Sequence, residues 1–244
     1  MNPEQNKPDA AVIIPSAGRG ARMGGGIPKQ FLEIGGIPVL AHTIRRLLAI
    51  ACIRKIVIPT SPDLFVRTRA TAQWCLDERK QSDDVTVDVI QGGMERMDSV
   101  RNGLHALTDD DITIVLVHDA VRPCFPLDAV KQAIDEADAS GAAIVAVPVR
   151  DTVKMVDGNL NILSTPDRNR VWLAQTPQVF RKDLFSHAYE MLKEKTYIAT
   201  DDASVVEHAG FPVRVVQGSN ENIKITYQSD LNFARLWLES NGAA

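Results

Sequence analysis

Apolar stretches typical of β-strands alternate with helical patterns along most of this 244-residue chain. The apolar stretches lack the polar alternation that a solvent-exposed sheet face produces, so helices must cover both faces of the expected sheet. Strands separated by helices favour parallel pairing, because a parallel connection has to return to the same end of the sheet. The five expected strands are Ala11–Pro15, Lys55–Pro59, Val85–Ile90, Ile112–His118 and Ala142–Val147.

Helical spacing follows each of the first four strands. Pro38 lies near the first turn of one expected helix, and Asp128 lies near the positive end of another. We therefore predict an α/β fold, a Rossmann-like three-layer α/β/α architecture with a mostly parallel sheet. The clearest apolar stripes are Leu40, Ile44, Leu47 and Leu48 in one helix and Val130, Ala133, Ile134 and Ala137 in the other.

The alternation stops after Pro148. Residues 150–167 show no helical stripe and indicate two polar strands joined at Asp157-Gly158-Asn159, a sequence that favours a hairpin turn. A two-stranded hairpin is not stable alone in water, so it must pack on its own domain or on a second subunit. Its length and polarity favour an extended β-hairpin dimerisation arm, and we expect a homodimer formed through it.

Strands and helices resume beyond the arm. Residues 1–10 are predicted to be a disordered tail, and residues 11–244 a single domain that includes the arm. The later elements are expected at Val171–Phe180, Val213–Val216 and Asn222–Thr226 as strands, and at Lys182–Lys193, Asp201–His208 and Ser229–Glu239 as helices.

Composition limits the classes of function. Three scattered cysteines, Cys52, Cys75 and Cys124, without CxxC spacing indicate reduced structural thiols of a cytosolic protein. No apolar stretch is long enough to cross a bilayer, and the first ten residues lack the apolar region of a signal peptide. We therefore expect a cytoplasmic protein with no membrane partner. The net charge of −4 argues against non-specific binding to nucleic acid, so an anionic ligand must meet a local basic cluster.

Such a cluster follows the first strand. Residues 16–32 hold five of the fifteen glycines, together with Arg19, Arg22 and Lys29, and contain no acidic residue. Glycines allow successive backbone N–H groups to surround an anion, and open α/β sheets bind ligands at the carboxyl ends of their strands. The loop therefore predicts a polyphosphate site. The alternative is a flexible surface loop with solvated basic residues.

Two well-known phosphate loops do not match this segment. A dinucleotide-binding GxGxxG motif requires glycine where Met23 stands, and no acidic ribose partner follows the second strand. This failure disfavours an NAD(P)-dependent oxidoreductase. A Walker loop fails as well, because Lys29 lies between Pro28 and Gln30.

Seven motifs in order resemble a specific family. PSAGRGARMGGGIPKQF is similar to the signature of nucleotidyltransferases that activate sugar phosphates. It is followed by GGMERMDSV, HDAVRP, VRDTVK, DRNRVWLAQTPQVF, TDDAS and NIKIT. In this combination, from about Ala11 to Ile225, the chain resembles the 2-C-methyl-D-erythritol 4-phosphate cytidylyltransferases of the non-mevalonate isoprenoid pathway. One departure is Ser16, where the family usually has alanine, and its backbone contact to the nucleotide is expected to survive.

The resemblance implies that CTP and 2-C-methyl-D-erythritol 4-phosphate react to give 4-diphosphocytidyl-2-C-methyl-D-erythritol and pyrophosphate. It assigns the phosphate-binding catalytic groups to Arg22, Lys29 and Lys224. Without the resemblance, Lys224 would be interpreted as a solvated strand lysine and Ser99 as a surface serine. The implied nucleotide-binding residues are Pro15, Ser16, Ala17, Gly18, Gly93, Met94, Ser99, Asp119 and Ala120.

The second substrate, a polyol phosphate, is implied to meet Arg122, Thr176 and Thr200, with Thr152 and Arg168 reaching the partner's active site from the arm. Thr200 is alternatively, or also, a helix N-cap. A carboxylate beside a triphosphate attracts Mg²⁺, so Asp119 is the candidate metal neighbour and a divalent cation the expected cofactor. His118 is expected to be a structural histidine, and Arg96 to fix its loop or add positive charge.

Two further functions stay open at this point. Ribitol 5-phosphate cytidylyltransferases share the first loop and the HDAxRP motif, whereas VRDTVK and DRNRVWLAQTPQ favour methylerythritol phosphate. A non-catalytic nucleotide-binding module is the third possibility, which the presence of Arg22, Lys29 and Asp119 disfavours.

Overall fold

The computed structural model describes the whole chain except residues 1–7, 19–25, 80–84, 193–196, 198 and 243–244. Its centre is a seven-stranded sheet in which only β10 runs antiparallel to its neighbours. The predicted Rossmann-like α/β fold with a mostly parallel sheet is confirmed. In spatial order the strands are β11 (Arg214–Gln217), β7 (Ala142–Pro148), β10 (Trp172–Arg181), β6 (Ile112–Val117), β1 (Asp9–Ile13), β4 (Ile53–Thr60) and β5 (Thr86–Gln91).

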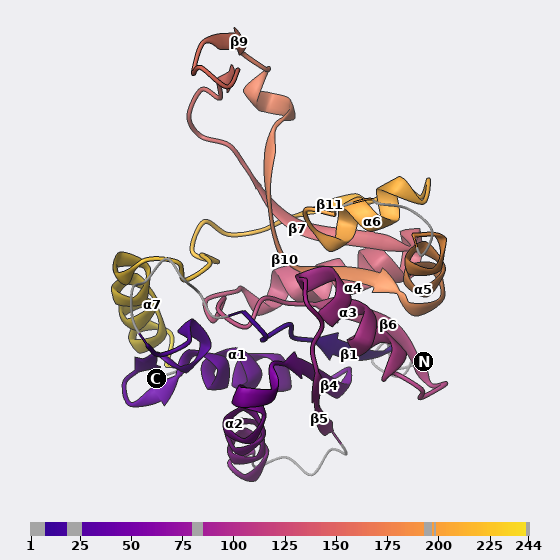
Figure 1. Ribbon diagram of the computed structural model, residues 1–244, viewed down its shortest axis with the longest axis vertical. Coiled ribbons are helices and arrows are strands. Elements are labelled where there is room, and N and C mark those ends of the chain that lie inside the picture. Colours follow the sequence, from indigo (N-terminus) through magenta and orange to yellow (C-terminus); the bar gives the residue numbers. More distant parts are fainter. Residues whose placement is uncertain (1–7, 19–25, 80–84, 193–196, 198, 243–244) are drawn as a thin grey trace.

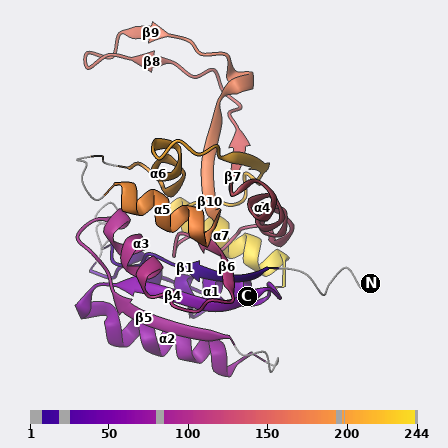
Figure 2. The ribbon, with the colours of Figure 1, turned by 90° about the vertical axis from the view of Figure 1, so that its right-hand side faces the viewer.

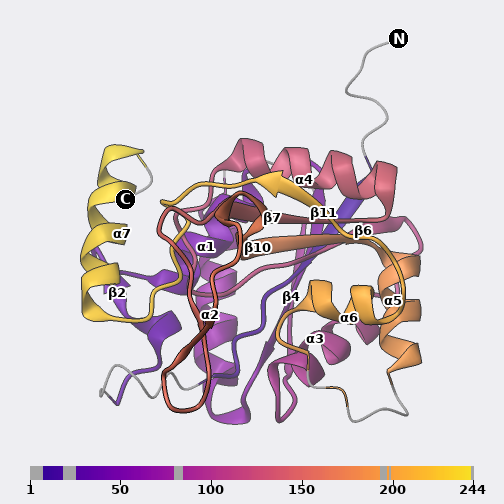
Figure 3. The ribbon, with the colours of Figure 1, turned by 90° about the horizontal axis from the view of Figure 1, so that it is seen from above.

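Helices cover both faces of this sheet. One apolar cluster joins one face to α1 (Val39–Leu48), α2 (Phe65–Asp77) and α4 (Leu127–Ser140). A second cluster joins the other face to α3 (Arg96–His105), α5 (Lys182–Met191) and α6 (Asp202–His208). Figure 3 shows α4 on one side of β7 and β10, with α5 and α6 on the other. Consecutive side chains in a strand point to opposite faces of the sheet. Because helices cover both faces here, the consecutive apolar residues of β1 are all fully buried.

Smaller elements complete the molecule. The closing helix α7 (Gln228–Ser240) packs in a third apolar cluster beside the sheet, next to the small β2–β3 ladder. The short elements are β2 (Glu33–Ile34), β3 (Ile37–Pro38), η2 (Lys29–Phe31), η3 (Pro62–Leu64), η4 (Arg168–Arg170), β8 (Met155–Val156) and β9 (Ile162–Ser164).

The strand order reverses beside β1. From β1 the chain builds β4 and β5 on one side, and it then returns to place β6 on the other side (Figure 1). At such a reversal the connections leave in opposite directions, which opens a crevice at the carboxyl ends of the two adjacent strands. Here those ends lead into the glycine-rich segment after β1 and the His118–Pro123 turn after β6.

Two expectations about the chain's local structure were wrong. Asp9 and Ala10, placed in the tail, belong to β1: the Ala10 N–H donates to Cys52 O at 2.9 Å, and Asp9 pairs with Arg54. Residues 1–7 of the expected tail lie outside the described residues. The range 222–226 is not a strand, because it crosses the carboxyl edge of the sheet instead of joining it. Its Ile225 N–H donates to Val121 O at 2.9 Å.

The expected hairpin forms and projects away from the sheet (Figures 1 and 2). In this structure the hairpin therefore does not pack on its own domain. The turn is longer than expected. Asp157 N–H donates to Asn161 O at 3.0 Å, and the positive φ of 66° falls at Leu160, although Gly158 is available. In the part of the chain described here, no helix is both long and apolar enough to cross a membrane.

We expect Gly103→Ala to destabilise the protein by about 1–2 kcal/mol. A Cβ at Gly103 would lie 2.6 Å from Cγ2 of Ile13, a fully buried residue of β1 that cannot move without displacing the strand. Overpacking usually costs about 1–3 kcal/mol, and so close a contact with a buried strand residue places this cost at the upper end, about 2–3 kcal/mol, above the gain in helix propensity of about 1 kcal/mol. Chemical denaturation measures the free energy of unfolding. Gly158→Ala is the control, because a Cβ at Gly158 meets nothing within 4 Å. An unchanged free energy of unfolding in Gly103→Ala would contradict the close packing of α3 on β1.

Candidate active site

A cleft of about 450 Å³ lies at the carboxyl ends of β1 and β6. Lys29 and Lys224, two of the three predicted catalytic residues, line it. The third, Arg22, lies outside the described residues. All the predicted nucleotide-binding residues also line this cleft, namely Pro15, Ser16, Ala17, Gly18, Gly93, Met94, Ser99, Asp119 and Ala120.

The two ends of the glycine-rich loop are held together by a side chain. Gln30 Nε2 donates to the backbone oxygen of Ser16 at 2.8 Å, and both residues are buried. The short helix η2 places Lys29 beside Gln30, and Lys29 Nζ donates to Thr226 O at 3.0 Å. Lys29 is thus fixed at the cleft wall between the loop and the late segment 222–226.

The second glycine motif forms the opposite wall. Gly93 N–H donates to Ser99 Oγ at 3.0 Å, and the Ser99 hydroxyl donates to Glu95 O at 3.3 Å. A Cβ on Gly93 would lie 2.2 Å from the Cβ of Asp98, so the turn packs directly on α3. Ser99 is buried, which contradicts its interpretation as a surface serine.

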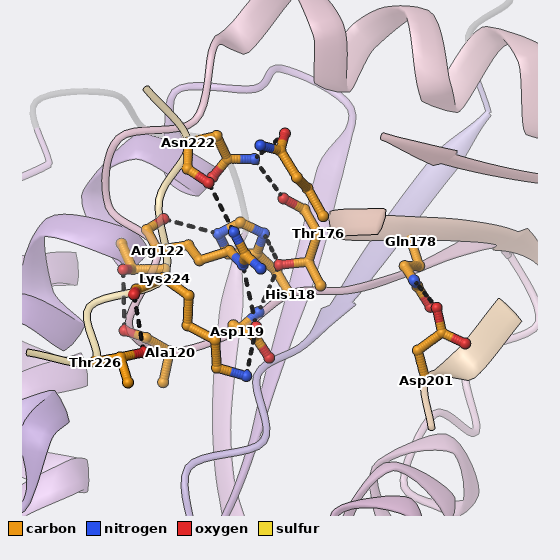
Figure 4. A network of polar contacts seen from close by, with 12 residues as sticks. His118, Asp119, Ala120, Arg122, Thr176, Gln178, Asp201, Asn222, Lys224 and Thr226 are labelled. Carbon is orange, nitrogen blue, oxygen red and sulfur yellow. Dashed lines mark hydrogen bonds and ion pairs between the residues drawn. The ribbon is translucent and has the colours of Figure 1, made fainter. Parts of the chain in front are cut away.

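Asp119 is the centre of an ion cluster (Figure 4). Its Oδ2 lies 3.0 Å from Lys224 Nζ and 3.1 Å from Arg122 Nε, and its Oδ1 lies 3.7 Å from Arg96 Nε. Burial disfavours the ionised carboxylate, but Lys224, Arg96 and Arg122 together hold the pKa of Asp119 well below its usual range. Three cations around one carboxylate leave positive charge for an anionic ligand.

Beneath this cluster, His118 is fully buried and fully hydrogen bonded (Figure 4). Its Nε2 lies 3.0 Å from Arg122 O, which can only accept, so Nε2 carries the proton. Nδ1 then accepts from the Thr176 hydroxyl at 3.2 Å, and this hydroxyl accepts from the Asp119 N–H at 3.0 Å. Burial lowers the pKa of His118 to about 4. His118 is therefore a neutral structural residue, as the sequence suggested.

A second cleft adjoins the first and shares Arg96, Asp119 and Lys224 with it. It is lined by three of the residues predicted to bind the second substrate, which are Arg122, Thr176 and Thr200. The other two, Thr152 and Arg168, are exposed on or beside the arm and reach neither cleft of their own chain. The N-cap of α6 is Asp201 and not Thr200, because the Asp201 carboxylate accepts from Ser204 N–H.

Sequence reasoning left three supporting residues without a clear role. Asn222 is fully buried and donates through Nδ2 to Thr176 O at 2.9 Å, which fixes the segment that carries Lys224. Gln30 closes the first loop, and Arg96 bridges Asp119 and the buried Asp202. Their partners lie 14 to 106 positions away in the sequence, so no local pattern could have identified these contacts.

The side chains that could ligate a metal ion here suit a cation that binds together with the phosphates of a substrate. Among the described residues no group of three or more His, Cys, Asp or Glu side chains could hold a metal ion. Asp119 Oδ1 lies 3.7 Å from Arg96 and is less tightly paired than Oδ2, and Mg²⁺ commonly takes one or two carboxylates together with substrate phosphates. The residues present therefore fit Mg²⁺ held mainly by a triphosphate, with one protein oxygen.

A cationic cleft at the switch point of a doubly wound sheet, with a second cleft that shares three of its charged residues, suits a nucleotidyltransferase. Comparison with known proteins gives the same class. The family model of IspD, 2-C-methyl-D-erythritol 4-phosphate cytidylyltransferase, matches residues 10–240. The chain belongs to this family.

Individual relatives match most of the chain. The chain is 44% identical to the 2-C-methyl-D-erythritol 4-phosphate cytidylyltransferase of Syntrophus aciditrophicus over 96% of this chain and 97% of the relative. It is 42% identical to that of Pelotomaculum thermopropionicum, with 92% of each covered. Among solved structures, 4-diphosphocytidyl-2C-methyl-D-erythritol synthase from Anaerococcus prevotii superposes with a TM-score of 0.80 at 30% identity, covering 96% of this chain and 100% of that one.

We expect Asn222→Ala to lower the free energy of unfolding by about 1–3 kcal/mol, because the buried Thr176 carbonyl loses its donor. Loss of the anchor also frees the segment that carries Lys224, so KM for the substrates should rise. Denaturation and steady-state kinetics measure both effects. The control is Asn220→Ala, which alters an exposed turn residue two positions earlier. Equal behaviour of the two variants would contradict an anchoring role for Asn222.

Proposed function

We propose that the protein transfers the cytidylyl group of CTP to 2-C-methyl-D-erythritol 4-phosphate, giving 4-diphosphocytidyl-2-C-methyl-D-erythritol and pyrophosphate for isoprenoid precursor synthesis. The observation that carries this proposal is the pair of adjoining clefts with Arg96, Asp119 and Lys224 in common. Two substrates bound in these clefts would meet at the shared residues. The family match and the named relatives do not favour the ribitol 5-phosphate alternative.

The nucleotide occupies the first cleft in this proposal. The cytosine lies between the Ser16–Gly18 backbone and the Gly93–Ser99 wall, where backbone groups can read its amino and carbonyl edge. The triphosphate then extends toward Lys29 and, by the family resemblance, Arg22. The Asp119 carboxylate faces the ribose, and the polyol phosphate lies against Arg122, Thr176 and Thr200.

The reaction needs no covalent enzyme intermediate. An oxygen of the polyol phosphate forms a bond to the α-phosphorus of CTP, and the bond between this phosphorus and the bridging oxygen of pyrophosphate breaks. Lys29, Lys224 and Arg22 stabilise the negative charge that develops, and the walls of the clefts fix the line of attack. The thiols are unsuited to act as nucleophiles, because burial raises the pKa of Cys75 to about 11 and of Cys124 to about 12.

Mg²⁺ is the proposed cofactor. When bound, it neutralises charge on the triphosphate and helps to orient it. Asp119 is the residue that would hold it, through the oxygen that faces Arg96, while Lys224 and Arg122 occupy the other oxygen.

The arm is proposed to form a homodimer. Its apolar side chains Met155, Leu160, Ile162 and Leu163 are 56%, 79%, 63% and 66% exposed, an arrangement that a free hairpin in water does not favour. Packing against a partner would bury them. The arm would then bring Thr152 and Arg168 to the second cleft of the partner, where the polyol phosphate binds.

Two broader assignments complete the proposal. The chain from Asp9 onward, two residues before the expected boundary at Ala11, acts as one nucleotidyltransferase domain, because the clefts draw residues from Pro15 to Thr226. A cytoplasmic location is supported by three buried free cysteines, Cys52, Cys75 and Cys124, which suit a reducing compartment.

Lys29→Ala should lower kcat by about 10²–10³-fold, because one preorganised donor to the developing charge is lost. Pyrophosphate release from CTP, Mg²⁺ and 2-C-methyl-D-erythritol 4-phosphate measures turnover, and ribitol 5-phosphate in the same assay tests the alternative substrate. Lys131→Ala is the matched control, since Lys131 pairs with Asp128 on the exposed face of α4. A kcat near that of the wild type would remove Lys29 from catalysis.

Mixed dimers test the shared active site. Lys29→Ala and Arg168→Ala subunits, carrying different affinity tags, are co-expressed and the heterodimer is purified. If the arm supplies Arg168 to the partner, one of the two sites has both intact groups, and activity returns to about half that of the wild type. If Arg168 acts within its own subunit, the heterodimer has no intact site and stays as inactive as the homodimers. A monomeric mass with full activity would also contradict the proposed dimer.

A further inference from the structure

Arg96 lies between two carboxylates on different sides of the active site. Its NH1 atom is 2.7 Å from Asp202 Oδ2, and its Nε atom is 3.7 Å from Asp119 Oδ1. The Arg96 side chain is 33% exposed, toward the two clefts that it lines, whereas that of Asp202 is 1% exposed. The ion pair of Arg96 with Asp202 is therefore shorter and more buried than the one with Asp119, and it lies behind the active site.

Asp202 is held rigidly at the first turn of α6. Its Oδ1 accepts from the Tyr189 hydroxyl at 3.2 Å, and Tyr189 is itself buried. The side-chain oxygen of Gln178 accepts from the backbone N–H groups of Asp202 and Ala203, each at 2.9 Å. The position of the carboxylate is thus determined by α5, β10 and α6 together.

This arrangement does not serve stability well. A buried ion pair is often no better for folding than apolar residues of the same volume, because both charges lose their hydration. Burial raises the pKa of Asp202, and Arg96 opposes this rise. Tyr189, which donates a hydrogen bond to Asp202, lies in an apolar cluster together with Phe185, Val205 and Val206. A charge kept at such a position points to a role in the site that Arg96 faces.

We propose that Asp202 is a positioning residue that holds the Arg96 guanidinium at the junction of the two clefts. The inference rests on the proposed function, because the attacking phosphate and the α-phosphate of the nucleotide would meet at this junction. Without its anchor, Arg96 would close on Asp119, whose Oδ1 is already 3.7 Å away. Arg96 would then neutralise Asp119 instead of the phosphate charge, and Asp202 itself touches no substrate.

Asp202→Asn is the first test, since it keeps the shape of the side chain and removes its charge. We expect kcat to fall about tenfold, with both KM values within about threefold of the wild type, because the ion pair with Arg96 is replaced by a weaker contact to a neutral amide. Asp183→Asn is the control. It breaks an exposed pair with Arg181 at the opposite edge of the sheet and should leave kcat and both KM values unchanged. A kcat of Asp202→Asn within about twofold of the wild type would overturn the proposal.

A double-mutant cycle separates positioning from mere structural support. If Asp202 acts through Arg96, Asp202→Asn has no further effect on kcat in an Arg96→Ala background, whereas independent roles give losses that multiply. Tyr189→Phe provides a milder change if Asp202→Asn folds poorly. It removes one hydrogen bond from Asp202, should lower kcat two- to fivefold, and should have no effect when Arg96 is absent. Multiplying losses in both cycles would overturn the proposal.

An assay of the wild-type protein distinguishes a failure of the proposed function from a failure of the proposed role of Asp202. Absence of pyrophosphate release from CTP and 2-C-methyl-D-erythritol 4-phosphate would contradict the proposed function. Normal release by the wild type together with normal kcat in Asp202→Asn would contradict only the role of Asp202. Circular dichroism on every variant establishes the folded fraction, so that kcat is expressed per folded protein.

Discussion

The carboxylate of Asp119 connects parts of the chain that are far apart in the sequence. Arg96 comes from the start of α3, Arg122 from the turn after β6, and Lys224 from the segment after β11, and each of these cations lies within 4 Å of one Asp119 oxygen. Repulsion between the three like charges would separate them in the absence of the carboxylate. Asp119 is therefore the group that allows a dense positive cluster to exist before any substrate binds.

The same cluster supplies positive charge to both clefts. Asp119 and Asp202 compensate two of the three positive charges, and the remaining one favours the phosphates of a ligand in either cleft. The hydrogen-bonded chain from Asp119 N–H through Thr176 to His118 fixes the backbone under the cluster. Because His118 is neutral, it supports this geometry without adding a fourth positive charge.

Rigid and exposed parts of the molecule have separate tasks. The sheet and its two helical layers bury the apolar side chains of β1 and β6. The carboxyl ends of these strands therefore have little freedom to move. The arm has no such core. Its strands pair only with each other among the described residues, and its apolar side chains remain exposed. The clefts are therefore built on a buried core, whereas the arm has none, and in the proposed dimer a partner surface would cover its apolar side chains.

The sequence alone determined the layers, the parallel strands, the hairpin and the loops that surround the cleft, because these follow from local hydrophobic period, glycine content and charge. It also placed Lys29 and Lys224 in the cleft, by resemblance to a family. Only the tertiary structure decided that residues 222–226 cross the sheet edge, and that Arg96 is held by Asp202. These contacts join residues 100 or more positions apart, where no periodicity relates the partners and the energy depends on burial and on the closeness of charges.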